Sequence, residues 1–188
     1  MRFLIVAFCI IVGSCICDDA SWERVPGMLR PIKGKLEADF GLVRKFNDLD
    51  YSIEGNGTMS ITPGVELVFC TEKPMKAKFT FSPTQVVIND GESGKTTKLN
   101  SEQEAWIKQI FKLQDSWFKG DVSVLKTDFD VSIQDEKTLL FIPKNPKVLA
   151  FVKTVQLHIE PNTKHIAKVE MTEASGDSIT IVFTNIRE

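Results

Sequence analysis

The strongest constraint on this chain is a period of two in its apolar residues, which runs from Gly34 almost to the C-terminus. The stretch GTMSITPGVELVFCTEKP, residues 57–74, shows it most clearly. Such alternation predicts strands that bury one face and expose the other. About eleven short runs of this kind, joined by tight turns, predict a mostly β fold with one large antiparallel sheet or barrel. The runs lie at residues 36–42, 59–61, 65–69, 79–81, 86–88, 95–99, 128–133, 137–143, 154–160, 166–174 and 178–186.

One long helix is predicted between the two sets of strands, in NSEQEAWIKQIFKLQDSWFKG, residues 100–120. Asn100 or Ser101 is a suitable N-cap, and Gly120 is suited to end the helix. Its apolar face has four residues at helical spacing: Trp106, Ile110, Leu113 and Trp117. No second long helix is predicted to cover this face, so it must lie on the sheet. Shorter helical segments are predicted at residues 21–30 and 145–153.

Two arrangements of this helix on the sheet are physically allowed. If the sheet curls tightly, the apolar residues form an ordinary filled core. If the sheet curves more widely, the same residues line a cavity and the helix becomes its lid. Periodicity alone does not choose between them.

The length and charge of the chain limit its class. A chain of 188 residues is long enough to bury a core as one domain without disulfides. Its 23 Lys and Arg nearly balance its 25 Asp and Glu. A nucleic-acid partner is therefore not expected, because binding to phosphate backbones requires a basic surface.

The first residues have the order of a secretory signal. Arg2 precedes an apolar run at residues 3–12 that is too short to span a bilayer, and small residues follow. We therefore expect residues 1–17 to be a signal peptide and residues 18–188 to be a single exported domain.

The signal can be removed in two ways. Cleavage after Cys17 would release a soluble domain. Alternatively VGSC, which ends at Cys15, is similar to a bacterial lipobox, and cleavage there would leave a lipid anchor on that cysteine. We expect the soluble product, because Gly13 and Ser14 make an imperfect lipobox.

No catalytic or metal-binding motif is found in the sequence. The only histidines are His158 and His165, which limits any base-and-nucleophile arrangement. Together with Glu160 they offer a weak metal site, but an exposed polar pair on a surface hairpin is the preferred interpretation. We expect no catalytic residue, no metal and no cofactor.

The pattern also resembles a known family, the outer-membrane lipoprotein carrier proteins called LolA. The resemblance covers about residues 32–187 and includes the closing hairpin around Gly176 and Asp177. Two residues depart from the family pattern. Leu42 stands where many members have Gln, and Thr62 precedes Pro63 where the best-known carriers have an Arg that latches the lid. The matching positions are Phe40, Arg44, Phe46, Leu49, Gly57, Met59, Ile61, Pro63, Leu67, Phe69, Pro74 and Asp90-Gly91.

The resemblance implies an unclosed barrel of about eleven strands with a helical lid, which works as a monomeric periplasmic shuttle for lipoproteins. It implies three partners: lipoprotein acyl chains, an inner-membrane ABC-type transporter that releases lipoproteins, and an outer-membrane acceptor. Two alternatives stay open: a lipid-anchored outer-membrane acceptor of the same fold, and an envelope β domain with a filled core that carries nothing.

Both lines of reasoning give one set of candidate lipid-binding residues. On the concave face of the sheet they are Leu36, Phe40, Leu42, Met59, Ile61, Leu67, Phe69, Phe79 and Phe81. On the inner side of the lid they are Trp106, Ile110, Leu113 and Trp117.

Overall fold

The computed structural model describes residues 19–99, 111–120 and 125–188. The N-terminal half contains α1 Asp19–Met28, β1 Leu36–Lys45, β2 Ser52–Thr62, β3 Glu66–Lys73, β4 Ala77–Phe81, β5 Val86–Asp90 and β6 Thr96–Lys98. Helical residues 111–119, called the central helix below, follow. The C-terminal half contains β7 Phe129–Asp135, β8 Thr138–Pro143, α3 Pro146–Leu149, β9 Val152–Ile159, β10 Ile166–Glu173 and β11 Ser178–Arg187.

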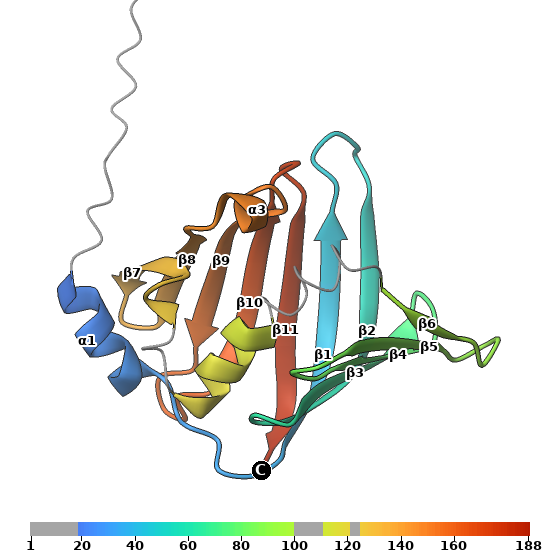
Figure 1. Ribbon diagram of the computed structural model, residues 1–188, viewed down its shortest axis with the longest axis horizontal. Helices are drawn as coiled ribbons and strands as arrows, with labels where there is room; N and C mark the ends of the chain where they lie inside the picture. Colours follow the sequence, from blue (N-terminus) through green and yellow to red (C-terminus); the bar gives the residue numbers. More distant parts are fainter. Residues whose placement is uncertain (1–18, 100–110, 121–124) are drawn as a thin grey trace, which may run out of the picture.

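All eleven strands form one antiparallel sheet in the order β6-β5-β4-β3-β2-β1-β11-β10-β9-β8-β7. The sheet consists of two meanders that join where β1 pairs with β11, for example at Leu42 opposite Ile181. The outermost strands, β6 and β7, are edges, so the sheet is curved but not closed (Figure 1). The central helix lies in front of the concave side of the sheet (Figure 1). The predicted fold, an unclosed antiparallel barrel with a helix over it, is confirmed.

Bulges and one glycine help the sheet to curve. Register shifts occur in the β1–β11, β2–β3, β9–β10 and β7–β8 ladders, and such bulges increase local bend and twist. Gly57, at the β2–β3 shift, is buried, and a Cβ there would lie 2.0 Å from the carbonyl oxygen of Cys70. The absent side chain also leaves room for Phe40 of β1 and Phe69 of β3 to meet across β2, with ring centroids 5.4 Å apart.

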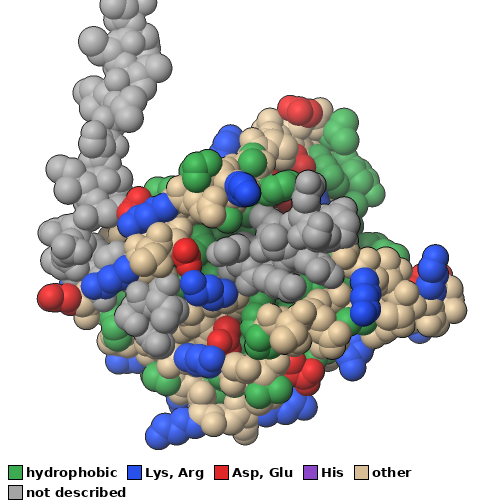
Figure 2. Space-filling view, in the orientation of Figure 1, with side chains coloured by type: hydrophobic (Ala, Val, Ile, Leu, Met, Phe, Trp, Pro, Cys, Tyr) green, Lys and Arg blue, Asp and Glu red, His purple; other side chains and the backbone are tan. Residues whose placement is uncertain are grey.

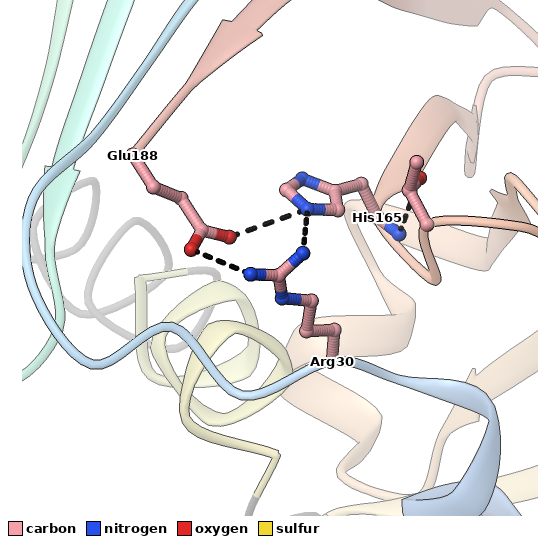
Figure 3. A network of polar contacts seen from close by, with 4 residues as sticks. Arg30, His165 and Glu188 are labelled. Atoms are coloured by element: carbon pink, nitrogen blue, oxygen red, sulfur yellow. Dashed lines mark hydrogen bonds and ion pairs between the residues drawn. The ribbon is translucent and has the colours of Figure 1, made fainter.

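The N-terminal segment closes one end of the barrel. α1 and the residues after it place Val25, Leu29 and Ile32 in the core. The backbone N–H of Arg30 donates to the carbonyl of Lys164 at 3.1 Å. The Arg30 side chain also contacts Glu188 at 2.9 Å and His165 at 3.3 Å (Figure 3). Half of the Arg30 side chain is exposed, so burial of the three apolar residues outweighs the ion pair.

The two shorter predicted helices are both present. α1 begins two residues before the predicted segment, and α3 covers only the start of the second one. Pro146 occupies the first turn of α3, and the side chain of Asn145 accepts a hydrogen bond from the N–H of Lys147. No helix in the described ranges is both long and apolar enough to cross a membrane.

The contact at Gly57 gives a paired test of this fold. Gly57→Ala should lower the free energy of unfolding by about 1 to 3 kcal/mol, because its Cβ would overlap the backbone of β3. Gly41→Ala, on the neighbouring strand β1, should be nearly neutral, since nothing lies within 4 Å of its Cβ. Urea denaturation of both variants measures the difference, and equal stabilities would contradict the packing described for β2 and β3.

Candidate functional site

The nine predicted sheet residues lie on one face of the sheet. The registers align Leu36, Ile61, Leu67 and Phe81 in one row across β1 to β4. A second row contains Met59, Phe69 and Phe79, and Phe40 and Leu42 share their face of β1 with Leu36. This concave side, called the inner face below, faces the central helix. The role of these nine residues in lipid binding stays a prediction.

The inner face continues into the C-terminal half, which the list of candidate residues omitted. Leu42 stands opposite Ile181, which pairs with Val169, which in turn pairs with Leu157. The same side carries Val155, Met171, Ile179 and Phe183. Their alternation is visible in the sequence, but only the pairing of β1 with β11 joins them to the predicted residues. The inner face is therefore about twice as wide as expected.

The central helix covers this face with large apolar side chains. Leu113 and Trp117 are 0 % and 2 % exposed, and Phe111 and Phe118 are also buried. The Trp117 ring lies 5.4 Å from that of Phe141, which is on β8. Leu113 and Trp117 therefore lie where the sequence placed them, whereas Trp106 and Ile110 fall outside the described residues.

The cavities that described residues line under the central helix are small. Three cavities there are lined by described residues, one with a volume of about 70 Å³ and two with about 10 Å³ each. Pockets for small molecules usually have several hundred Å³. Trp117 lines all three cavities, and Gln114 lines two of them. Among the described residues, the central helix therefore covers this part of the inner face.

Two hydrogen bonds join the C-terminal end of the central helix to other segments, and one ion pair lies within the helix. The N–H of Gly64, in the β2–β3 turn, donates to Asp115 Oδ1 at 2.5 Å, and Lys119 Nζ lies 2.6 Å from Asp115 Oδ2. The N–H of Ile32 donates to the carbonyl of Phe118 at 2.7 Å. Asp115 thus joins the helix to the turn that begins with Pro63.

A charged cluster lies at one end of the inner face. Arg44 follows Leu42 on the same side of β1 and contacts Glu173 at 2.9 Å and Asp177 at 3.5 Å. Its guanidinium also lies over the ring of Phe46, 5.1 Å from the centroid. The N–H of Asn47 donates to Asp177, and with the Arg44 side chain it lowers the pKa of that carboxyl below its ordinary value. These bonds tie the β1–β2 hairpin to the β10–β11 turn.

The two histidines have separate partners. His158 contacts Glu170 at 2.5 Å, whereas His165 contacts Arg30 and Glu188 (Figure 3). Burial raises the pKa of Glu170, but hydrogen bonds from His158 and Lys168 outweigh burial and lower it. The His165 side chain is only 10 % exposed, so the interpretation as an exposed pair is wrong. Within the described ranges, no three His, Cys, Asp or Glu side chains gather as metal ligands would.

Comparison with known proteins identifies the family. A family model described as outer membrane lipoprotein carrier protein LolA matches residues 36–188. The chain belongs to the LolA family. The match begins at the first residue of β1 and therefore includes the whole sheet and the central helix. No curated protein gives a significant sequence match.

Several solved structures are similar to this LolA-family chain at low sequence identity. A DUF1329 family protein from Desulfovibrio piger is 8 % identical, with a TM-score of 0.52 over 89 % of this chain and 91 % of that one. A LolA superfamily protein from Nitrosomonas europaea is 9 % identical, with a TM-score of 0.45 over 89 % and 91 %. MucB of Pseudomonas aeruginosa, in its complex with MucA, is 13 % identical, with a TM-score of 0.47 over 90 % of this chain and 57 % of that one.

The position of Trp117 gives a test of the covered inner face. Trp117→Ala should join the three cavities and so increase the binding of an apolar fluorescent dye, at a cost of about 3 to 5 kcal/mol in stability. Phe141→Ala is the matched control, because Phe141 is equally buried but lines none of these cavities. Dye titration of both variants decides, and equal dye binding would contradict the role given to Trp117.

Proposed function

We propose that this chain is a periplasmic carrier that binds the acyl chains of lipoproteins between the inner face and the central helix. It moves them from the inner membrane toward the outer membrane. The observation that carries the proposal is the continuous apolar inner face, which runs across both halves of the sheet and packs against the central helix. Membership of a lipoprotein carrier family supports the same role.

The free energies of burial are consistent with replacement of the central helix by acyl chains on the inner face. Exposing the large apolar side chains of the central helix costs about 1.5 to 3 kcal/mol each. One acyl chain of about sixteen carbons gains roughly 12 kcal/mol on leaving water, at about 0.8 kcal/mol per methylene. A guest with two or three such chains compensates for displacing the helix. The small cavities of the covered form are therefore compatible with a carrier that opens on loading.

The same balance requires an energised donor. Acyl chains in a bilayer are already buried, so a carrier does not extract them without an input of free energy. An inner-membrane ABC-type transporter that releases lipoproteins is the donor we propose, and an outer-membrane acceptor is the receiver. Residues 1–17 serve in this scheme as the export signal.

Two other functions remain as alternatives. The small cavities favour an envelope domain with a permanently filled core, which would bind no lipid. Native mass spectrometry after mild purification separates the two, because a carrier retains bound lipid. A lipid-anchored acceptor of the same fold is the other alternative. It would incorporate radioactive palmitate at Cys15, whereas a soluble carrier would not.

A charge on the inner face should prevent binding. Phe69→Glu places a carboxylate among Met59, Leu67 and Trp117, so bound lipid should disappear from the native mass spectrum. Val182→Glu is the control, since Val182 is 43 % exposed and lies on the opposite side of β11 from Ile181 and Phe183. Circular dichroism checks that both variants fold. Retention of lipid by a folded Phe69→Glu variant would count against the proposed site.

The contact at Asp115 should control opening. Asp115→Ala removes the acceptor for the Gly64 N–H and the partner of Lys119, and a hydrogen bond to a charged group contributes about 1.5 to 3 kcal/mol. We expect the uptake of a fluorescent fatty acid to become at least about tenfold faster. Glu37→Ala, which breaks an exposed pair with Lys35, is the control. Stopped-flow fluorescence measures both rates, and an unchanged rate in Asp115→Ala would show that this contact does not hold the helix.

A further inference from the structure

Exposed apolar side chains are concentrated at one end of the barrel. Seven large hydrophobic side chains are exposed among the described residues, and five of them lie at turns on the same end of the sheet. Leu49 and Tyr51 lie in the β1–β2 hairpin, Met75 follows β3, and Leu149 and Phe151 lie at the end of α3 and just after it. Exposure of several such residues in one region is typical of a binding surface.

The part of this end around α3 is also basic. Lys147 and Lys153 flank Leu149 and Phe151 and are exposed, and neither forms an ion pair within the described residues. The sequence from residue 137 to residue 159 contains four Lys and no Asp or Glu. Figure 2 shows hydrophobic and basic side chains together in the region where Figure 1 places α3. We call Lys147, Leu149, Phe151 and Lys153 the α3 patch.

The acidic side chains near the α3 patch either form ion pairs with other basic residues or lie on a different hairpin. Asp130 pairs with Lys144 at 3.0 Å, and Asp128 pairs with Lys112 at 2.6 Å. Glu173 pairs with Arg44. Asp48 and Asp50 flank Leu49 on the β1–β2 hairpin, which confines the basic surface to the α3 side.

The α3 patch lies near the cavity of about 70 Å³ under the central helix. That cavity is lined by Val155, Met171 and Ile179, each within a few residues of the strand end at which α3 lies. The N–H of Ala174 donates to the carbonyl of Phe151 at 2.9 Å, which joins the patch directly to the β10–β11 turn. A surface that contacts the α3 patch would therefore be close to the end of the inner face.

We propose that the α3 patch docks this chain on an anionic lipid bilayer, with Leu149 and Phe151 in the headgroup region and Lys147 and Lys153 against acidic headgroups. Aromatic and aliphatic side chains flanked by Lys are suited to this interface. With two apolar side chains and two charges, the affinity should be comparable with that of a single acyl anchor, about 10⁴ M⁻¹. Such weak binding suits a protein that must leave the membrane again. Docking adds the membrane as a partner to the proposed function. The biological purpose of docking rests on the proposed function, but the binding itself does not.

Vesicle sedimentation tests the proposal. The protein is purified from cells after they have processed it. Vesicles of phosphatidylcholine alone are compared with vesicles that contain about 30 % phosphatidylglycerol. We expect at least about tenfold stronger binding to the anionic vesicles, and this preference should fall as salt is raised. Lys147→Gln with Lys153→Gln should reduce the binding roughly twentyfold, at about fivefold per lysine. Leu149→Ser with Phe151→Ser should reduce it about tenfold or more on both kinds of vesicle.

Matched variants provide the controls. Val65→Ser with Val182→Ser removes two exposed apolar side chains away from this end, and Lys33→Gln with Lys78→Gln removes two exposed charges elsewhere. Both control pairs should bind within about twofold of the unaltered protein. Equal loss in the control and patch variants, or no preference for anionic vesicles, would overturn the proposal.

A second measurement locates the contact. Phe151→Trp should add fluorescence that brominated lipids quench, whereas Val182→Trp should add fluorescence that they do not quench. Quenching of neither would overturn docking through α3, and a cross-link from position 151 to a protein without quenching would indicate a protein partner instead. Uptake of the fluorescent fatty acid in solution, measured on the same variants, separates the two proposals. Loss of docking with normal uptake implicates the α3 patch alone, and failed uptake with normal docking implicates the inner face alone.

Discussion

The structure depends on one constraint: a broad sheet with an apolar concave side must keep that side out of water. The eleven strands align Leu36, Ile61 and Leu67 in one half and Leu157, Val169 and Ile181 in the other. The sheet is not closed, so its own strands do not complete the cover. The central helix and α1 supply it with Trp117, Leu113 and Val25. The strength of these contacts decides how readily the inner face is uncovered.

The two parts of this cover, α1 and the central helix, are held in place by different contacts. α1 and the following residues are fixed by buried apolar side chains and by backbone hydrogen bonds. The central helix buries comparable side chains, and among the described residues its polar contacts to the sheet and to the N-terminal segment include Asp115 with Gly64 and Phe118 with Ile32. Apolar burial is not directional, so under the proposed function a guest with enough methylenes would replace the helix without a specific binding motif. This explains why a binding face of this kind needs no catalytic or metal-binding residue.

The two ends of the barrel differ in character. One end is closed by the segment around Arg30, with Glu188 and His165 packed against it. The other end has the exposed side chains of the β1–β2 hairpin and α3, and the ion pairs of Arg44 join the hairpin to the β10–β11 turn. A carrier that exchanges lipid with membranes needs such an asymmetry, because only one end has to approach a bilayer.

The sequence by itself determined the number of strands, which residues of each strand share a face, and the presence of a helix with Leu113 and Trp117 turned inward. Those properties are local, since a period of two or of 3.6 residues places side chains without reference to the rest of the chain. Tertiary structure alone decided that β1 pairs with β11, that Val169 and Ile181 therefore extend the inner face, and that Asp115 reaches the backbone of Gly64. It also decided that the central helix lies against the concave side, where the cavities lined by described residues are small. These features depend on contacts between residues far apart in the chain, and the alternation of apolar residues is the same whichever strands become neighbours.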